Sequence, residues 1–225
     1  MGQVVTLELY FWPVSAVCLL QQTSLRLIVA EFAPNSIDLL QRMVDAVEQV
    51  RQRLAKSAAL LANAGLPYAV VGGNAVAAWV ATVDQAAVRN TQDVDLLIRR
   101  SDFAAAKVVL EGAGFVFRHI AGLDMFLDHV GASPRQAIHL IFAREFVKPG
   151  EALANPDVDQ SVDLGPFRVL RLDALIRIKL TAFRDKDRTH LRDMIGVKLI
   201  DASWTRTLPP ALAERLQGLL DTPDG

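Results

Sequence analysis

Residues 89–98 read Arg-Asn-Thr-Gln-Asp-Val-Asp-Leu-Leu-Ile, and this stretch decides the prediction of the fold. Side chains of an extended segment alternate between two faces, so Asp93 and Asp95 point to one side while the apolar residues between and after them point to the other. Two carboxylates this close repel each other unless a cation lies between them. Mg²⁺, or Mn²⁺ in its place, is the natural candidate, because it binds a few carboxylates together with phosphate oxygens. The alternative is an exposed strand edge with two solvated acids.

A second pattern lies upstream of this pair. The apolar run 68–71 predicts a strand, Gly72 and Gly73 follow it, and residues 74–81 predict a helix. Glycines at a strand–helix junction let the backbone approach a ligand closely, and the free N–H groups of the helix start attract a phosphate. Asn74 is a favoured N-cap and can also offer its side-chain amide to a phosphate oxygen. A tight turn without a ligand is the alternative, but the two aspartates downstream favour the phosphate site.

These residues resemble the nucleotidyltransferase superfamily that includes DNA polymerase β, and more narrowly its AbiEii-like branch. In that branch a Gly-Gly turn precedes an R-x-T-x-D-[VI]-D strand, which matches residues 72–75 and 89–95. A third match, residues 175–193, resembles a helical segment with the pattern K…R-x-K-D…D. The likeness covers roughly residues 36–200. Three motifs in the right order are more specific than any one of them.

The resemblance implies a Mg²⁺-dependent enzyme that moves a nucleoside monophosphate from a nucleoside triphosphate to a hydroxyl group. Asp93 and Asp95 would be catalytic and would hold the metal ion. The resemblance and the residue types together indicate a set of nucleotide-binding residues: Gly72, Gly73, Asn74, Arg89, Thr91, Lys179 and Lys186. Arg89 would contact phosphate, or pair with Asp93 when no metal is bound. Asp187 would orient Lys186 or complete a structural ion pair.

One position departs from the pattern of the family. Active members take a third carboxylate from a later strand, here predicted at residues 137–143, where this chain has His139. We include His139 among the catalytic candidates, although an imidazole adds no negative charge and favours softer metals than Mg²⁺. Asp124 and Asp128 are other sources of a third carboxylate, which we do not favour. The replacement leaves nucleotide binding intact as an expectation and makes catalysis the open question.

The sequence is therefore consistent with two functions. The first is a nucleotidyltransferase acting on RNA, protein or a small hydroxylated molecule, with a toxin–antitoxin setting and an antitoxin partner implied by the AbiEii-like resemblance. The second is a catalytically weakened nucleotide-binding module that is retained for binding a nucleotide or a partner protein. His139 is the feature that favours the second.

The predicted fold is α/β, a small mixed sheet of four to six strands flanked by helices. Residues 1–34 are expected to form an N-terminal extension, 35–166 the nucleotidyltransferase-like domain, and 167–225 a helical segment that completes the cleft. Helices are predicted at 36–64, 74–81, 102–111, 172–183, 186–195 and 209–220, and strands at 67–71, 93–98, 115–119, 125–127, 137–143 and 167–170. The stretch 144–166, rich in Pro and Asp, is expected to be a loop.

Composition argues against several classes of protein. The chain has 225 residues, 52% of them hydrophobic, and a formal charge of −1. That balance argues against a generic nucleic-acid binder, which usually carries a basic excess. A single cysteine excludes an internal disulfide and fits a reducing compartment. No stretch suits a membrane span or a cleaved signal, so the cytoplasm is the expected location.

Overall fold

The computed structural model describes residues 34–223, and the chain divides into two units, Met1–Asp45 and Ala46–Gly225. The first predicted domain, residues 1–34, lies outside the described residues except for its last position. The first described helix, α2 (Pro34–Asn63), contributes residues to both units. Every residue of the candidate site belongs to the second unit, to which the following description applies.

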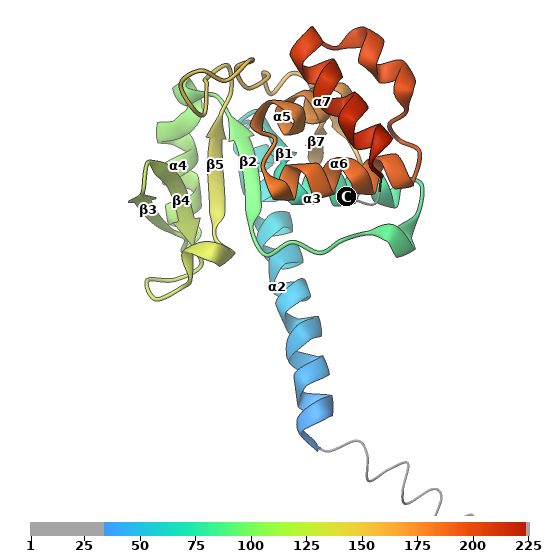
Figure 1. Ribbon diagram of the computed structural model, residues 1–225. Coiled ribbons are helices and arrows are strands. Elements are labelled where there is room, and N and C mark those ends of the chain that lie inside the picture. Colours follow the sequence, from blue (N-terminus) through green and yellow to red (C-terminus); the bar gives the residue numbers. More distant parts are fainter. Residues whose placement is uncertain (1–33, 224–225) are drawn as a thin grey trace, which may run out of the picture. The chain divides into compact units, whose positions relative to one another are not determined.

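A seven-stranded mixed sheet forms the centre of the second unit, with the order β3-β4-β5-β2-β1-β7-β6 (Figure 1). The strands are β1 (Tyr68–Val71), β2 (Val94–Ile98), β3 (Val116–Ile120), β4 (Leu123–Leu127), β5 (Ile138–Phe142), β6 (Ser161–Asp163) and β7 (Arg168–Leu170). β2 runs antiparallel to β1 and parallel to β5. The central strands β1 and β2 are buried along their whole length, as expected for strands covered on both faces.

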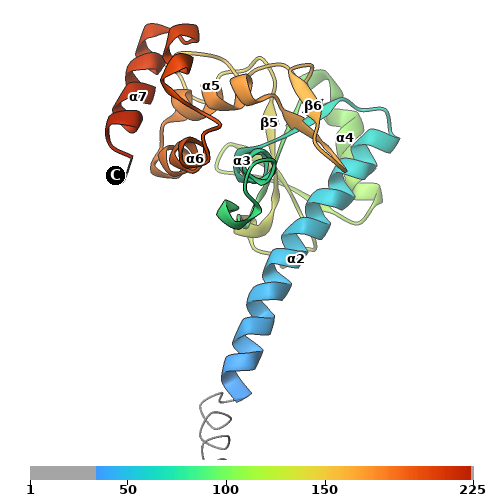
Figure 2. The ribbon, with the colours of Figure 1, turned by 90° about the vertical axis from the view of Figure 1, so that its right-hand side faces the viewer.

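Helices cover both faces of this sheet. They are α3 (Gly72–Ala81), α4 (Phe103–Gly112), α5 (Leu172–Ala182), α6 (Asp185–Gly196) and α7 (Pro210–Asp221). Figure 2 shows α4 on one side of the sheet and α5, α6 and α7 on the other. Within the second unit, α2 buries Val50, Leu54, Ala58 and Leu61 at helical spacing in the shared core.

Aromatic packing explains which face of the sheet α4 occupies. Phe103 of α4 contacts the ring of Phe142 on β5 edge-on, with ring centroids 5.7 Å apart. Along β5 the buried and half-buried residues alternate, so His139 points to the opposite face from Phe142. The face of the sheet that α4 covers is therefore apolar core, and His139 lies on the opposite face.

The α/β fold class is confirmed, but the predicted number of strands was too low. The difference includes β6, which lies inside the segment 144–166 that we predicted to be a loop. β6 pairs with β7 through backbone hydrogen bonds, and Gly165 between them has the positive φ of +87° that a tight connection requires. A three-residue edge strand needs no apolar alternation, so the hydrophobic pattern does not reveal it.

Over residues 34–223, the structure contains no helix that combines the length and apolar character needed to cross a membrane.

Candidate functional site

The site begins where the end of β1 meets the start of β2. Val71 lies opposite Asp95 in the antiparallel ladder, so Gly72 follows directly beside that aspartate. Gly72 has φ +66°, and a Cβ atom at this position would lie 1.8 Å from Oδ2 of Asp95. Only glycine both adopts this backbone conformation at little cost and leaves room for the carboxylate. The predicted glycine turn and the predicted acidic strand thus meet at Gly72 and Asp95.

Asp93 is held in place by side chains around it. The Thr91 hydroxyl donates a hydrogen bond of 2.7 Å to Oδ1 of Asp93, and the Asn74 amide donates one of 2.8 Å to its backbone oxygen. Gly73 leaves space for Thr91, since a Cβ there would lie 3.0 Å from the threonine side chain. These contacts tie the start of α3 to the start of β2 and fix the direction of the Asp93 carboxylate.

The prediction that Asn74 caps the helix was wrong. α3 begins at Gly72, its N-cap is Val71, and Val71 makes no side-chain capping hydrogen bond. The Asn74 side chain lies one turn too late for a cap, and its amide is used by the Asp93 carbonyl. Its predicted contact with phosphate stays a prediction, while the first N–H groups of α3 are left without a side-chain cap next to Asp95.

His139 completes the group from the neighbouring strand. It lies opposite Asp95 in the parallel β2–β5 ladder. Its Nδ1 is 3.4 Å from Oδ1 of Asp95 and 3.8 Å from Oδ2 of Asp93, and its Nε2 is 3.1 Å from the carbonyl oxygen of Pro134. The contact with the Asp95 carboxylate raises the pKa of His139 above its ordinary value, although partial burial opposes this. One ligand atom of each of Asp93, Asp95 and His139 lies within 4.8 Å of the others.

Asp95 is the most buried member of this group, with 9% of the residue exposed. Burial by itself would raise the pKa of this carboxyl group, but His139 and the positive charges of Lys186 and Lys179 hold the pKa below its usual value. Asp95 is therefore an anion at neutral pH. A buried anion that faces a cavity is a strong ligand for a cation.

Neither alternative carboxylate reaches the site. β4 does pair with β5, but Met125 lies opposite His139, so Asp124 points to the other face of the sheet. Its carboxylate lies 2.6 Å from Nδ1 of His119 and 3.6 Å from Arg100. Asp128 accepts hydrogen bonds from the buried Arg53 of α2. Both acids are engaged in ion pairs elsewhere, and the third position of the site is an imidazole.

An ion cluster centred on the buried Asp187 joins α5 to α6. Residues of these two helices line the cavity described below and form its helical wall. The Lys179 ammonium donates to Oδ1 of Asp187 at 3.0 Å, and Nε of Arg184 donates to Oδ2 at 2.7 Å. Lys179 is 3% exposed and Asp187 is fully buried. Burial lowers the pKa of Lys179, and the Asp187 carboxylate partly opposes that shift. Asp187 was expected to orient Lys186 or to complete a structural pair; it holds Lys179 and Arg184.

The two remaining predicted basic residues lie in different places. Lys186 is exposed and lines the cavity next to Lys179. Arg89 instead forms a two-pronged ion pair with Asp193 of α6, with both hydrogen bonds at 2.9 Å. It does not pair with Asp93, and it is not among the residues that line the cavity. A role for Arg89 in binding phosphate stays a prediction.

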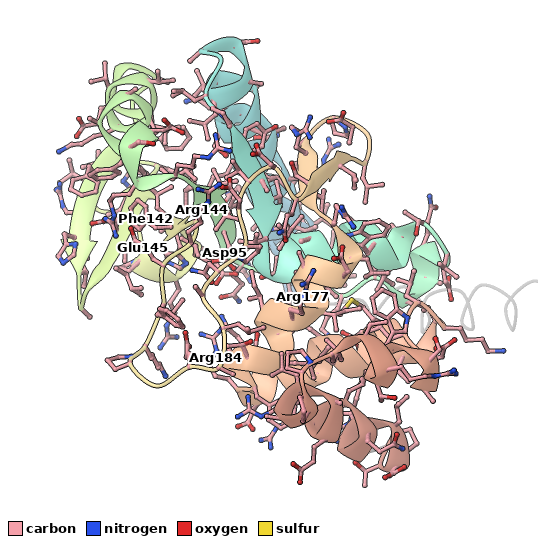
Figure 3. All side chains as sticks on the ribbon, turned by 90° about the horizontal axis from the view of Figure 1, so that it is seen from above. Asp95, Phe142, Arg144, Glu145, Arg177 and Arg184 are labelled. Atoms are coloured by element: carbon pink, nitrogen blue, oxygen red, sulfur yellow. The ribbon has the colours of Figure 1, made fainter. Side chains whose placement is uncertain are left out.

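The two walls enclose a cavity of about 400 Å³, which is within the range of small-ligand sites. Figure 3 shows Asp95 between the segment that carries Phe142, Arg144 and Glu145 and the helical segment that carries Arg177 and Arg184. Five basic side chains and three acidic ones line the cavity: Lys148, Arg177, Lys179, Arg184 and Lys186 with Asp93, Asp95 and Glu151. The cavity is basic although the chain as a whole is slightly acidic.

Sequence reasoning missed three of these residues. Lys148 comes from the long connection after β5, and Arg177 and Arg184 flank Lys179 on the helical wall. Arg184 lies in the third matched motif, and its capping role at the start of α6 identifies it more clearly. Arg177 lies two residues before Lys179 in the third matched motif, so the motif could have drawn attention to it.

Comparisons with known proteins give similarity only at the level of structure. A scan against known protein families and a search of curated proteins find no match. The structure is similar to that of the antibiotic-resistance factor ANT(2'')-Ia, covering 81% of this chain and 92% of the other at 14% identity and a TM-score of 0.45. It is also similar to an antigenic nucleotidyltransferase-like protein from Paracoccidioides brasiliensis, covering 80% and 91% at 16% identity and a TM-score of 0.47. Similarity at this level assigns no activity to the chain.

The contact between Gly72 and Asp95 generates a stability prediction. Gly72→Ala should destabilise the fold more than Gly65→Ala, because both glycines have φ +66° but nothing lies within 4 Å of a Cβ at Gly65. The left-handed conformation costs both variants about 1–2 kcal/mol, and forced overpacking costs Gly72→Ala a further ~1–3 kcal/mol. Chemical denaturation measures the difference. Equal losses in the two variants would show that the space beside Asp95 is not restrictive.

A second prediction concerns pH. Burial, together with the charge of Lys179, lowers the pKa of His190 to about 4, and its Nδ1 is buried without a partner in the described structure. Protonation of His190 is less favourable in the folded state than in the unfolded state. The contribution of His190 to the free energy of unfolding is therefore complete above pH 6.5 and falls as the pH drops toward 4. The loss is at most about 3 kcal/mol.

His190→Gln should flatten this part of the stability curve, measured by denaturation between pH 7 and pH 4. Exposed His129→Gln is the matched control and should leave the curve unchanged. The comparison with wild type separates His190 from His139, whose raised pKa acts in the opposite direction. A variant curve as steep as that of wild type would contradict the assignment.

Proposed function

We propose that this protein transfers a nucleoside monophosphate from a nucleoside triphosphate to a hydroxyl group of an acceptor. The observation that carries the proposal is the position of Asp95, a buried carboxylate pressed against the Gly72 backbone at the start of α3. A carboxylate that suits a metal ion and a helix start that suits an anion therefore lie side by side, which supports the proposal. The order of the motifs in the sequence supports the same function independently.

The residues at the acidic end suit a divalent cation. Asp93 and Asp95 present oxygen ligands and His139 presents a nitrogen, and the absence of a side chain at position 72 makes room for the Asp95 carboxylate. A bound dication would neutralise phosphate charge and orient the phosphorus that is attacked. Thr91 and Asn74 keep the Asp93 carboxylate directed at the site, so that little reorganisation is needed when the substrate arrives.

The basic end suits the phosphates of the nucleotide. Gly72 at the start of α3 lines the cavity, and Lys179, Arg184 and Lys186 line it from the helical wall. Lysine acts on phosphate as a point charge and arginine as a two-pronged donor. The hydroxyl of the acceptor would lose its proton and attack the α-phosphorus in line. The bond between that phosphorus and the α–β bridging oxygen would break, and pyrophosphate would leave.

RNA is the acceptor that we favour within this proposal, because of the AbiEii-like motifs at residues 72–75 and 89–95. The same resemblance implies an antitoxin protein that restrains the activity. A small hydroxylated molecule, as in drug modification, is the second acceptor class. A small regulator-like gene next to the gene for this protein would support the first, and neighbouring resistance genes would support the second.

A nucleotide-binding module without turnover is the alternative function, and His139 is the observation that favours it. With an imidazole at the third position, the site carries one negative charge fewer than a three-carboxylate site. The module would bind a nucleotide in the presence of a dication and would transfer nothing to RNA, protein or small-molecule acceptors. Measured transfer by the wild-type protein therefore separates the two functions.

Asp93→Asn and Asp95→Asn should each lower transfer of α-labelled nucleotide to total tRNA, protein or hydroxylated drugs by at least about a hundredfold. The amide keeps the size of the side chain but removes the negative charge that holds a cation. Asp163→Asn is the control, because that carboxylate is largely exposed and lies outside the cavity. Full activity in either site variant would sink the proposal. No transfer by wild type, with dication-dependent nucleotide binding retained, would favour the module.

Asp187→Asn tests the helical wall. Removing one partner of a buried ion pair leaves Lys179 charged and unpaired, at a cost of about 3–5 kcal/mol, and it also frees Arg184. We expect both stability and nucleotide affinity to fall. Lys179→Met combined with Asp187→Leu should recover much of the stability, because both buried charges are gone, but not the affinity. Recovery of nucleotide binding in the double variant, measured by calorimetry, would show that the pair has only a structural role.

A further inference from the structure

The third ligand position of the candidate metal site is occupied by a nitrogen donor. His139 lies on β5 directly opposite Asp95 on β2, and its Nδ1 faces the oxygens of both aspartates at 3.4 and 3.8 Å. Backbone pairing of the two strands fixes the distance between the imidazole and the carboxylates. The imidazole is therefore part of the cluster itself and does not merely lie near it.

We propose that His139 makes this a mixed carboxylate–imidazole centre that selects first-row transition-metal dications, such as Mn²⁺ or Co²⁺, over Mg²⁺. Mg²⁺ is a hard ion that prefers oxygen ligands, whereas first-row transition metals readily accept an imidazole nitrogen. The inference deepens the metal site used in the proposed function, but it concerns metal binding alone and does not require that any nucleotide be transferred.

The orientation of the ring supports a direct metal ligand. Nε2 of His139 lies 3.1 Å from the carbonyl oxygen of Pro134, the geometry of an Nε2–H donor. With the proton on Nε2, the neutral ring presents the lone pair of Nδ1 to the space beside Asp93 and Asp95. A backbone carbonyl that fixes the tautomer of a histidine through its other nitrogen is the usual support of a metal-ligating imidazole.

Among residues 34–223, no other carboxylate joins this group of possible ligands, although Glu151 also lines the cavity. Asp124 points to the opposite face, where His119 and Arg100 contact it, and Asp128 is paired with Arg53. Within residues 34–223, the group of possible metal ligands here consists of Asp93, Asp95 and His139 alone. Two negative charges and one neutral nitrogen shift the balance from a hard ion toward one that gains from the nitrogen.

The backbone at position 72 makes room for the Asp95 carboxylate. A Cβ at position 72 would overlap Oδ2 of Asp95, so glycine allows that oxygen to keep its position. Asp95 is largely buried, and Asp93 is oriented by Thr91. Ligands that are held in place before a metal arrives discriminate more sharply between ions, because the site cannot rearrange to suit each one.

Calorimetry on the full chain without nucleotide or acceptor tests the proposal, with Mn²⁺, Co²⁺ and Mg²⁺ titrated separately. We expect wild type to bind Mn²⁺ and Co²⁺ at least about tenfold more tightly than Mg²⁺. His139→Asp restores three carboxylates and should lower that ratio by about tenfold or more, mainly through tighter Mg²⁺ binding. His129→Asp makes the same change at an exposed histidine outside the cavity and should leave the ratio as in wild type.

A spectroscopic measurement on wild type does not depend on the variant folding. Mn²⁺ bound to protein labelled with ¹⁵N-histidine should show electron spin-echo modulation from one directly bound imidazole nitrogen. Absence of that nitrogen signal from bound Mn²⁺, an unchanged ratio in a folded His139→Asp variant, or no metal binding by wild type would each overturn the proposal.

These results are distinguishable from failure of the proposed function. Selective Mn²⁺ binding through His139, with no transfer to any acceptor, would leave the metal inference standing while the enzyme proposal fails. Transfer that is supported equally by Mg²⁺ and Mn²⁺, with no nitrogen signal, would leave the enzyme proposal standing while the metal inference fails.

Discussion

The close approach of the Gly72 backbone to the Asp95 carboxylate is the constraint on which the rest of the site depends. The antiparallel pairing of β1 with β2 brings the two residues together, and the positive φ of Gly72 turns the chain away into α3 at that point. Any side chain at position 72 would occupy the space of the carboxylate oxygen. The first N–H groups of a helix and a buried anion are consequently neighbours. The carboxylate suits a cation and the helix start suits an anion, so the two together favour a cation with a bound phosphate.

A second set of interactions brings the helical wall to this corner. Asp187 joins Lys179 of α5 to Arg184 at the start of α6, so two positive charges of the cavity depend on one buried carboxylate. If Lys179 or Arg184 is removed, water cannot replace its hydrogen bond to Asp187, because Asp187 has no accessible surface. The cost of burying the charges of Lys179 and Asp187 is tolerable only while the two satisfy each other. Structural stability and the basic character of the cavity are therefore coupled through the same side chain.

Part of this site is visible in the sequence, because strand alternation and glycine turns are local properties. Asp93 and Asp95 share a face if residues 93–95 are extended, and Gly72 marks the end of a strand without reference to the rest of the chain. Asn74 was misread as a cap because its partner is a backbone carbonyl 19 residues away. Arg89 and Asp193 are 104 residues apart in the chain, and no local pattern predicts such a pair. The basic residue types were visible, but which of them face the cavity depends on how α5 and α6 pack.

Composition misleads in a similar way, since a formal charge of −1 gives no sign of a cavity with a basic lining. The lining of the cavity has an excess of basic side chains, yet Asp93 and Asp95 place an acidic end within the same 400 Å³. A nucleoside triphosphate with a bound dication has the complementary arrangement, with a positive ion at one end of a chain of negative oxygens. A purely basic groove would bind phosphates but repel the metal ion, and a purely acidic one would do the reverse. In the metal centre that we propose, His139 would fit between these requirements, because a neutral ligand would add a bond to the metal ion without adding negative charge that would repel the phosphates.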